Sequence, residues 1–265
     1  MILDQNMKLH PYTLITGATS GIGYELALIA AREKNNLVLV ARDSVKLETV
    51  RTEIRRQHKE VSVKILTVDL AKANAAKKVL GFCHANDLFI DTLINNAGFG
   101  DYGQFSKSDL NVQRSMIDLN IKTLTELTHL FLPNMLKNKN GKIMNLGSVA
   151  SFLPGPLMSV YFATKNYVLS FSRALSEELR GTGVNVTCLC PGATSTGFGK
   201  AAHVSETHAT ANPKTTPKEV AEFGWYSMQA GETVAIYGSG NRIMLQLTKF
   251  VPRNIVTRLV KRVQR

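Results

Sequence analysis

The chain has 265 residues, of which 44% are apolar, and its mean hydropathy is −0.04. These values predict a globular protein with a substantial core, and they leave no run of about 18 apolar residues for a membrane-spanning helix. The formal net charge is +12, but seven Lys and Arg and no Asp or Glu lie between Asn241 and Arg265, so the basic balance is mostly local and argues against a nucleic-acid-binding body.

Short apolar runs alternate with longer segments of helical periodicity along the chain. Strands are predicted at residues 12–16, 37–41, 61–68, 92–94, 142–146, 184–190 and 233–236, and helices at 21–34, 44–58, 71–86, 118–137, 161–180 and 217–229. Several runs are continuously apolar, as in strands covered on both faces, so an α/β fold with a parallel sheet between helices is expected. We interpret residues 1–240 as one domain and residues 241–265 as a basic, amphipathic C-terminal extension.

A glycine-rich turn follows the first predicted strand. It reads Thr16-Gly17-Ala18-Thr19-Ser20-Gly21-Ile22-Gly23 and leads into a helical pattern. Glycines permit close backbone approach, and free N–H groups at a helix start face an anion, so this turn is a candidate phosphate site. Its spacing is G-x-x-x-G-x-G, and a tight connection without a ligand is the alternative interpretation.

The ends of the second and third strands bear on the choice of cofactor. A carboxylate at the end of the second strand would hold a ribose hydroxyl of NAD, but Ala41 and Arg42 stand there. A guanidinium binds a 2′-phosphate, so NADP is predicted, unless Arg42 is a solvated loop charge. Asp69, followed by Leu70, either accepts a bond from the adenine amino group or caps the next helix.

Polar residues also follow the later strands. Asn95-Asn96-Ala97-Gly98 leaves room for a ribose, Gly147-Ser148 places a hydroxyl at the same sheet edge, and Tyr161 and Lys165 share one helix face. Reduction of a carbonyl creates an alkoxide that needs a proton. We expect the Lys165 ammonium to lower the pKa of Tyr161, and Ser148 to polarise the carbonyl. A Tyr–Lys pair alone is more often a surface pair.

Taken in order and spacing, five motifs resemble the main branch of the short-chain dehydrogenase/reductase family. They are residues 16–23, residues 95–98, Ser148, residues 161–165 and Pro191-Gly192. The resemblance spans about residues 10 to 240. It implies a Rossmann-type, doubly wound sheet of seven parallel strands, a nicotinamide cofactor, no metal, and a homo-oligomer.

The resemblance also implies roles for single residues. Tyr161 would be the general acid/base, Ser148 would stabilise the carbonyl, and Lys165 would bind ribose and tune Tyr161. Asn120 would kink a helix and hold a water in a proton relay. The implied cofactor contacts are Gly17, Thr19, Ser20, Gly21, Ile22, Gly23, Arg42, Asp69, Leu70, Asn96, Ala97, Gly98, Tyr161, Lys165, Pro191, Gly192 and Thr194.

Two segments are expected to form the substrate mouth and a lid. The first contains Phe152, Leu153 and Met158, which either line an apolar pocket or pack in the core. The second, residues 194–216, contains His203 and His208, which we interpret as solvated loop residues.

The C-terminal extension has two unlike faces. Its apolar side chains fall on one helical arc and its basic ones on the opposite side. Such a helix either lies on an anionic membrane or packs on the body or a partner subunit. The apolar set is Ile255, Val256, Leu259, Val260 and Val263, and the basic set is Arg258, Lys261, Arg262 and Arg265.

These observations favour a cytoplasmic, NADPH-dependent carbonyl reductase acting on a hydrophobic small molecule. The residues before His10 lack the pattern of a signal peptide, and Cys83, Cys188 and Cys190 are expected to be free thiols in a reducing compartment. Alternatives are an oxidative alcohol dehydrogenase of steroid or acyl type, and an NADP-sensing protein without turnover. A nucleic-acid-binding protein is disfavoured because no aromatic residues interleave the basic ones.

Overall fold

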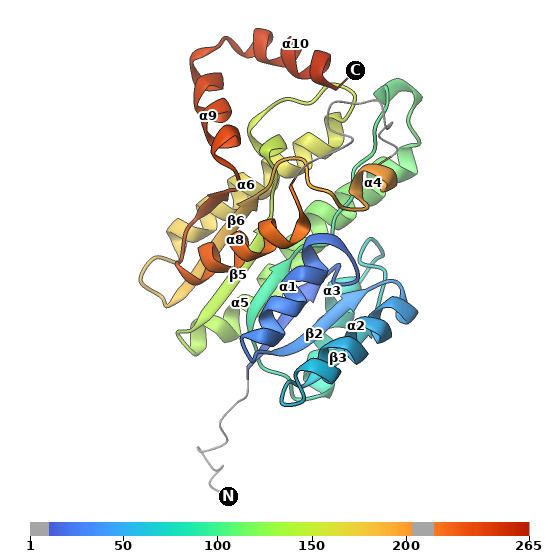
Figure 1. The fold of residues 1–265 in the computed structure, drawn as a ribbon, viewed down its shortest axis with the longest axis vertical. Helices are drawn as coiled ribbons and strands as arrows, with labels where there is room; N and C mark the ends of the chain where they lie inside the picture. The colour runs from blue at the N-terminus through green and yellow to red at the C-terminus, as the bar shows by residue number, and fades with distance from the viewer. Residues whose placement is uncertain (1–10, 203–214, 265) are drawn as a thin grey trace, which may run out of the picture.

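The computed structural model describes residues 11–202 and 215–264, and its centre is a seven-stranded sheet (Figure 1). The strands are β1 (Tyr12–Thr16), β2 (Asn36–Ala41), β3 (Val63–Thr67), β4 (Ile90–Asn95), β5 (Gly141–Leu146), β6 (Val184–Cys190) and β7 (Val234–Ile236). They pair in parallel in the order β3-β2-β1-β4-β5-β6-β7. The predicted Rossmann-type, doubly wound fold is therefore confirmed.

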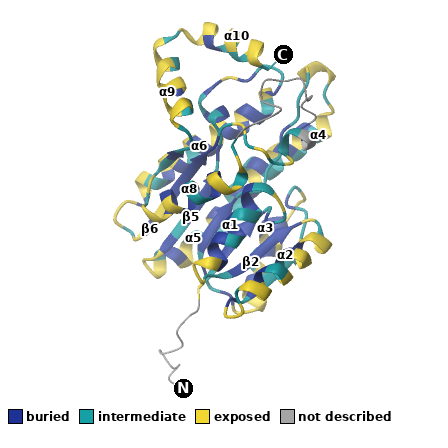
Figure 2. Cartoon of the chain, in the orientation of Figure 1, coloured by how far each residue is buried: buried dark blue, intermediate teal, exposed yellow. Residues whose placement is uncertain are grey.

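Helices cover both faces of the sheet. One face packs against α1 (Gly21–Arg32), α2 (Ser44–Gln57) and α8 (Pro217–Gln229), and the other against α3 (Ala75–Ala85), α5 (Leu124–Lys137) and α6 (Ser159–Glu178). Central strand residues such as Leu14, Ile15 and Leu93 are fully buried between these layers (Figure 2). Burial on both faces explains why the strand sequences are continuously apolar.

The helix predicted at 118–137 begins earlier than expected. Asp109 caps α4 (Leu110–Ile117) by accepting the N–H of Asn111 at 2.8 Å. The chain then passes through a π-helical segment, Asp118–Thr123, before continuing as α5. Helical structure therefore runs from Leu110 to Lys137 with one local change of pitch.

The helix predicted at 71–86 begins later, at Ala75. Asn74, which precedes α3, has a left-handed φ of 60°. Asp69 accepts the N–H of Ala71 at 3.0 Å in a turn before this helix. The Asp69 side chain thus stabilises a local turn and does not cap α3. Its contact with the adenine amino group stays a prediction.

The C-terminal segment forms two helices where one was expected. After β7 come α9 (Ser239–Leu247), a single 3-10 turn (Thr248–Phe250) and α10 (Arg253–Val263). Together they form an arm beyond the carboxyl end of the sheet (Figure 1). The domain boundary placed at residue 240 stays a prediction.

Candidate active site

The candidate site lies where the strand order reverses, beyond the carboxyl ends of β1 and β4. From β1 the chain adds β2 and β3 on one side, and from β4 it adds β5, β6 and β7 on the other. Ligands of open α/β sheets bind at such a switch point. The segments that follow β1, β4 and β5 contain most of the predicted site residues.

The glycine turn after β1 packs tightly against the first residues of the loop that follows β4. Gly17 and Gly21 have φ values of 68° and 57°, which side chains rarely adopt. A Cβ on Gly23 would clash with the Gly17 oxygen and with the Asn96 amide nitrogen. The Ser20 side chain makes no capping bond, so the first N–H groups of α1 are not capped by that hydroxyl. This arrangement fits a pyrophosphate.

Asn96 braces this turn. Its side-chain nitrogen donates to the Thr16 oxygen at 2.8 Å and to the Gly17 oxygen at 3.2 Å. The Thr16 hydroxyl accepts the backbone N–H groups of Asn96 and Ala97, each at 3.0 Å. The side-chain nitrogen of Asn96, predicted as a ribose contact, is thus engaged in shaping the phosphate loop.

Arg42 lies at the carboxyl end of β2 and is exposed. Within the described ranges the guanidinium has no ion-pair partner. The next carboxylate, Asp43, caps α2 by accepting the N–H of Lys46 at 3.0 Å, and that bond lowers the pKa of Asp43. The end of β2 therefore offers an available guanidinium, which fits a 2′-phosphate.

Tyr161 and Ser148 meet at the end of β5. Ser148 begins a short 3-10 turn, where its hydroxyl accepts the N–H of Ala150 at 3.1 Å and donates to the Pro191 oxygen at 3.5 Å. Tyr161 lies in the first turn of α6, and its phenol hydrogen-bonds the Ser148 side chain. The Tyr161 phenol and the Ser148 hydroxyl thus lie side by side beyond the carboxyl end of β5.

Lys165 lies one turn further along α6 and is buried. Its Nζ donates to the Leu146 oxygen at 2.6 Å and lies 5.8 Å from the centroid of the Tyr161 ring. The Lys165 ammonium is therefore held beside the phenol by the end of β5.

The pKa of Tyr161 departs from the sequence expectation. Burial raises the pKa of Tyr161 to about 12, and the Ser148 bond only partly opposes this effect. Burial also lowers the pKa of Lys165 to about 8, while the Cys188 and Cys190 thiols act in the opposite direction. The expectation that the ammonium makes the phenol acidic is not met, because removal from water dominates and the opposing effect comes from Ser148 and not from Lys165.

Asn120 lies in the π-helical segment, as the predicted distortion of a helix requires. Its side-chain nitrogen donates to the Phe99 oxygen at 3.0 Å and to the Thr164 hydroxyl at 3.1 Å, and its oxygen accepts the Phe99 N–H at 3.2 Å. A Cβ on Gly98 would lie 3.0 Å from the Asn120 oxygen. Asn120 therefore joins the loop after β4 to α6 at the residue that precedes Lys165.

Comparison with known proteins assigns the family. Residues 11–206 match the family model of the short chain dehydrogenases. The chain belongs to the short-chain dehydrogenase family. Human very-long-chain 3-oxoacyl-CoA reductase is 36% identical over 188 residues, which cover 69% of this chain and 59% of that protein. The chain thus spans about three fifths of that relative.

Two further matches extend over more of the chain. Ketoacyl reductase HetN from Nostoc sp. is 31% identical, with 90% of this chain and 82% of that protein covered. A short-chain dehydrogenase from Sphingobium yanoikuyae, solved in complex with NADPH, has a TM-score of 0.81 and 32% identity, with 91% and 94% of the two chains covered.

The remaining predicted contacts of this short-chain dehydrogenase lie in the loop after β6. The Pro191 oxygen accepts the N–H of Val149 at 2.9 Å, and the Thr194 hydroxyl donates to the Gly192 oxygen at 3.0 Å. A Cβ on Gly192 would lie 2.6 Å from the side-chain nitrogen of Asn241 on α9. The loop is therefore fitted between the Ser148 turn and the C-terminal arm.

Apolar side chains surround the Tyr161 ring. A Cβ on Gly100 would lie 2.8 Å from the Phe198 ring, 3.0 Å from Met158 and 3.2 Å from Tyr161. The Phe198 and Tyr161 ring centroids are 5.2 Å apart. Met158 and Leu153 are both buried in the apolar cluster that contains Tyr161, and the Phe152 ring packs against that cluster beneath the Arg173 guanidinium, so the choice between pocket lining and core packing stays open. His203 and His208 lie outside the described residues.

Sequence analysis missed a buried polar chain beneath the site. Asn95 donates to Thr128 at 3.1 Å and to Asn145 at 2.9 Å, and Asn145 donates to Ser172 at 3.0 Å. Asn95 and Asn145 are register partners on β4 and β5. The sequence signal for this network was an asparagine near the end of both β4 and β5, because buried amides need hydrogen-bond partners.

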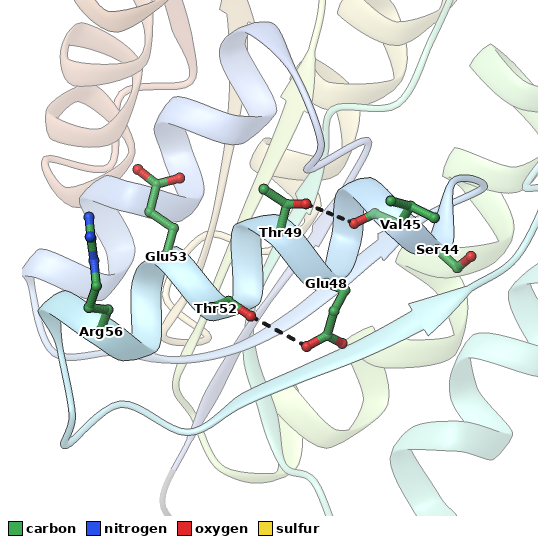
Figure 3. Close-up of a pocket in the computed structure, with 7 residues that line it drawn as sticks. All are labelled: Ser44, Val45, Glu48, Thr49, Thr52, Glu53 and Arg56. Atoms are coloured by element: carbon green, nitrogen blue, oxygen red, sulfur yellow. Dashed lines mark hydrogen bonds between the residues drawn. The ribbon is translucent and has the colours of Figure 1, made fainter.

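A surface depression on α2 lies apart from this site (Figure 3). Its lining comes entirely from residues 44–56 of that helix, so no second element encloses it. Within the described ranges, no His, Cys, Asp and Glu side chains group as metal ligands, and no helix is long and apolar enough to cross a membrane.

Proposed function

We propose that this short-chain dehydrogenase is an NADP(H)-dependent oxidoreductase that reduces the carbonyl group of a hydrophobic small molecule. The observation that carries the proposal is the buried, hydrogen-bonded phenol of Tyr161 beside Ser148 and Lys165, next to the glycine turn. When bound, the nicotinamide supplies the hydride that a carbonyl carbon accepts.

Ser148 and Tyr161 would act on the carbonyl oxygen. Both are hydroxyl donors at one point, so they can hold the oxygen and polarise the carbonyl. As negative charge develops on that oxygen, the Tyr161 hydroxyl transfers its proton to it. The raised pKa of Tyr161 keeps the phenol protonated at neutral pH, and an alkoxide is a stronger base than the phenolate left behind. The Tyr161 phenol is therefore in the form that proton donation during a reduction requires.

Lys165 would stabilise the phenolate after the transfer. Its ammonium lies on the same side of α6, and the Leu146 carbonyl holds it in place. Phenolate charge developing at Tyr161 offsets part of the cost of burying the ammonium. Asn120, through Thr164 and Phe99, would position α6 against the loop after β4.

The proposal extends to the cofactor contacts. Gly17, Thr19, Ser20, Gly21, Ile22 and Gly23 would bind the pyrophosphate, Arg42 the 2′-phosphate, Asp69 and Leu70 the adenine side, Ala97 and Gly98 the ribose, and Pro191, Gly192 and Thr194 the nicotinamide. The available Arg42 guanidinium supports NADP over NAD.

The apolar mouth supports a hydrophobic substrate. Phe198, Met158 and Gly100 meet at the edge of Tyr161, where a polar substrate would lose water without replacement bonds. Cytoplasmic location and homo-oligomerisation belong to the same proposal; the free thiols of Cys83, Cys188 and Cys190 support a reducing compartment.

The test is an NADPH-oxidation screen across aldehydes, ketones, 3-oxoacyl thioesters and steroids, with NADPH binding measured in parallel. We expect turnover of an apolar carbonyl compound in at least one class. Tight NADPH binding with no turnover in any class would favour a nucleotide-sensing protein instead.

A further inference from the structure

The C-terminal arm, residues 239–264, exposes an unusual amount of apolar surface. Exposed fractions of its large apolar side chains run from 36% for Met244 to 87% for Phe250. The other described elements have at most two such side chains each, whereas seven gather within this arm. The set is Ile243, Met244, Leu247, Phe250, Ile255, Leu259 and Val263.

The arm does pack on the body, but with only part of its apolar surface. Leu245 and Val256 are buried in the cluster that contains Met158 and Tyr161, and Val260 packs against it. On α9, Ile243 and Leu247 lie one turn apart and face away from Leu245. The predicted apolar arc of α10 is therefore split, with Val256 inward and Ile255, Leu259 and Val263 outward.

The end of the arm is fastened to the loop that follows β4. The Tyr102 hydroxyl donates to the Gln264 oxygen at 2.6 Å. The same loop leads to Phe105 and Leu110, which are 62% and 54% exposed. The arm is thus a fixed structure whose outward apolar side chains have no cover in the described chain (Figure 2).

The outward surface is also strongly basic. Lys249, Arg253, Arg258, Lys261 and Arg262 are exposed, and no Asp or Glu occurs between Asn241 and Arg265. Arg242 instead turns to the body, where its guanidinium donates to the Ile236 oxygen at 2.8 Å and lies over the Phe223 ring. None of the described ion pairs includes a residue of the arm. A partner that binds this surface must therefore offer an apolar interior to the exposed apolar side chains and anionic groups at its surface to the Lys and Arg side chains.

We propose that the outer surface of this arm docks on an anionic lipid bilayer. Exposed Phe and Leu side chains enter the boundary of the acyl chains, while the Lys and Arg side chains pair with anionic head groups. A second copy of the chain is a poorer fit, because a symmetric contact would bring the same cations together.

Docking would also place the substrate mouth at the membrane, a consequence that rests on the proposed function. The inner face of the arm shares its apolar cluster with Tyr161, Met158 and Phe198. A carbonyl compound dissolved in lipid would then lie close to the site that reduces it.

The test is cosedimentation of the full chain with phosphatidylcholine vesicles, with and without phosphatidylglycerol, at low and high salt. We expect binding only when phosphatidylglycerol is present, and weaker binding at high salt. Leu247→Asp/Phe250→Asp should lower the binding constant at least tenfold, and Arg258→Glu/Arg262→Glu should lower it about fivefold or more per residue. Val45→Asp, on exposed α2, is the matched control and should bind like the natural chain.

Further measurements separate this proposal from its alternatives. The two arm variants and Val45→Asp should retain their circular dichroism and their NADPH oxidation with a water-soluble carbonyl. Tyr161→Phe, which should lose that activity, should still bind vesicles. Equal binding to both vesicle types, or an equal loss in Val45→Asp, would overturn the proposal. So would full vesicle binding by Leu247→Asp/Phe250→Asp with loss of an oligomer in sedimentation, because that result assigns the surface to a second copy.

Discussion

At the scale of single residues, the protonation of the site depends on burial more than on neighbouring charge. Tyr161 and Lys165 are both buried. Burial raises the pKa of Tyr161 and lowers the pKa of Lys165, so it favours the neutral form of each side chain. Sequence spacing correctly placed the two side chains on one face of a helix. It could not give the direction of the Tyr161 shift, because that depends on how much water the whole fold removes.

The pKa of Lys165 predicts a specific pH dependence of stability. Its pKa falls from 10.5 in the unfolded chain to about 8 in the folded one, so the unfolded state holds more protons between these values. The free energy of unfolding should therefore rise through this window, while below pH 8 the cost of the buried ammonium is fully present. Relative to Lys165→Met, the natural chain should gain about 2–3 kcal/mol between pH 8 and 10.5.

Urea unfolding at several pH values measures this difference. Lys77→Met, on the exposed side of α3, is the control and should follow the natural chain at each pH. A constant difference between the natural chain and Lys165→Met would show that the lysine is not held in a desolvated position.

Arg42 predicts the cofactor preference. Arg42→Ala should raise the KM for NADPH about tenfold or more, because a charge-assisted contact to the 2′-phosphate is lost, and should leave the KM for NADH nearly unchanged. Arg55→Ala, in the last turn of α2, is the matched control. Steady-state kinetics with both cofactors decide; a natural chain that turns over NADH faster than NADPH would reject the assignment.

At the scale of elements, the sequence predicted the ends of a helix well where a capping motif directly precedes the apolar pattern of that helix. Thr216 and Glu219 form a capping box, and α8 spans Pro217–Gln229 as predicted. The early start of α4 and the existence of α9 were missed. Asp109 caps α4 without a strong apolar pattern behind it, and Ser239-Gly240-Asn241 at the start of α9 is typical of a loop.

The junction between the glycine turn and α1 makes a stability and binding prediction. Gly23→Ala places a Cβ against the Gly17 oxygen and the Asn96 amide, and both are fixed by other bonds. We expect a lower melting temperature and at least tenfold weaker NADPH binding. Calorimetry and fluorescence titration measure the two effects.

Gly81→Ala is the matched control for this change. Gly81 lies inside α3, and a Cβ added there would meet no atom within 4 Å, so alanine should stabilise the helix by up to about 1 kcal/mol. If Gly23→Ala melts and binds NADPH like the natural chain, the turn is not packed as described.

At the scale of the whole molecule, strand alternation and the order of motifs were sufficient to predict the parallel sheet. They also placed the functional residues at one edge of it, since parallel strands end together. What pattern could not reveal was long-range pairing: the Asn95–Asn145 contact, the brace that Asn96 provides, and the partition of the C-terminal arc between body and solvent. Each depends on which surfaces meet after folding, and no local spacing encodes that.

The central claim is that the Tyr161 hydroxyl supplies the proton during carbonyl reduction. Tyr161→Phe removes that hydroxyl and keeps the ring that packs on Phe198. The measurement is single-turnover NADPH oxidation with an accepted substrate, beside NADPH affinity, with Tyr167→Phe on the exposed side of α6 as the control. The account predicts a loss of at least a hundredfold in rate with unchanged NADPH affinity. A rate in Tyr161→Phe close to that of the control would contradict it.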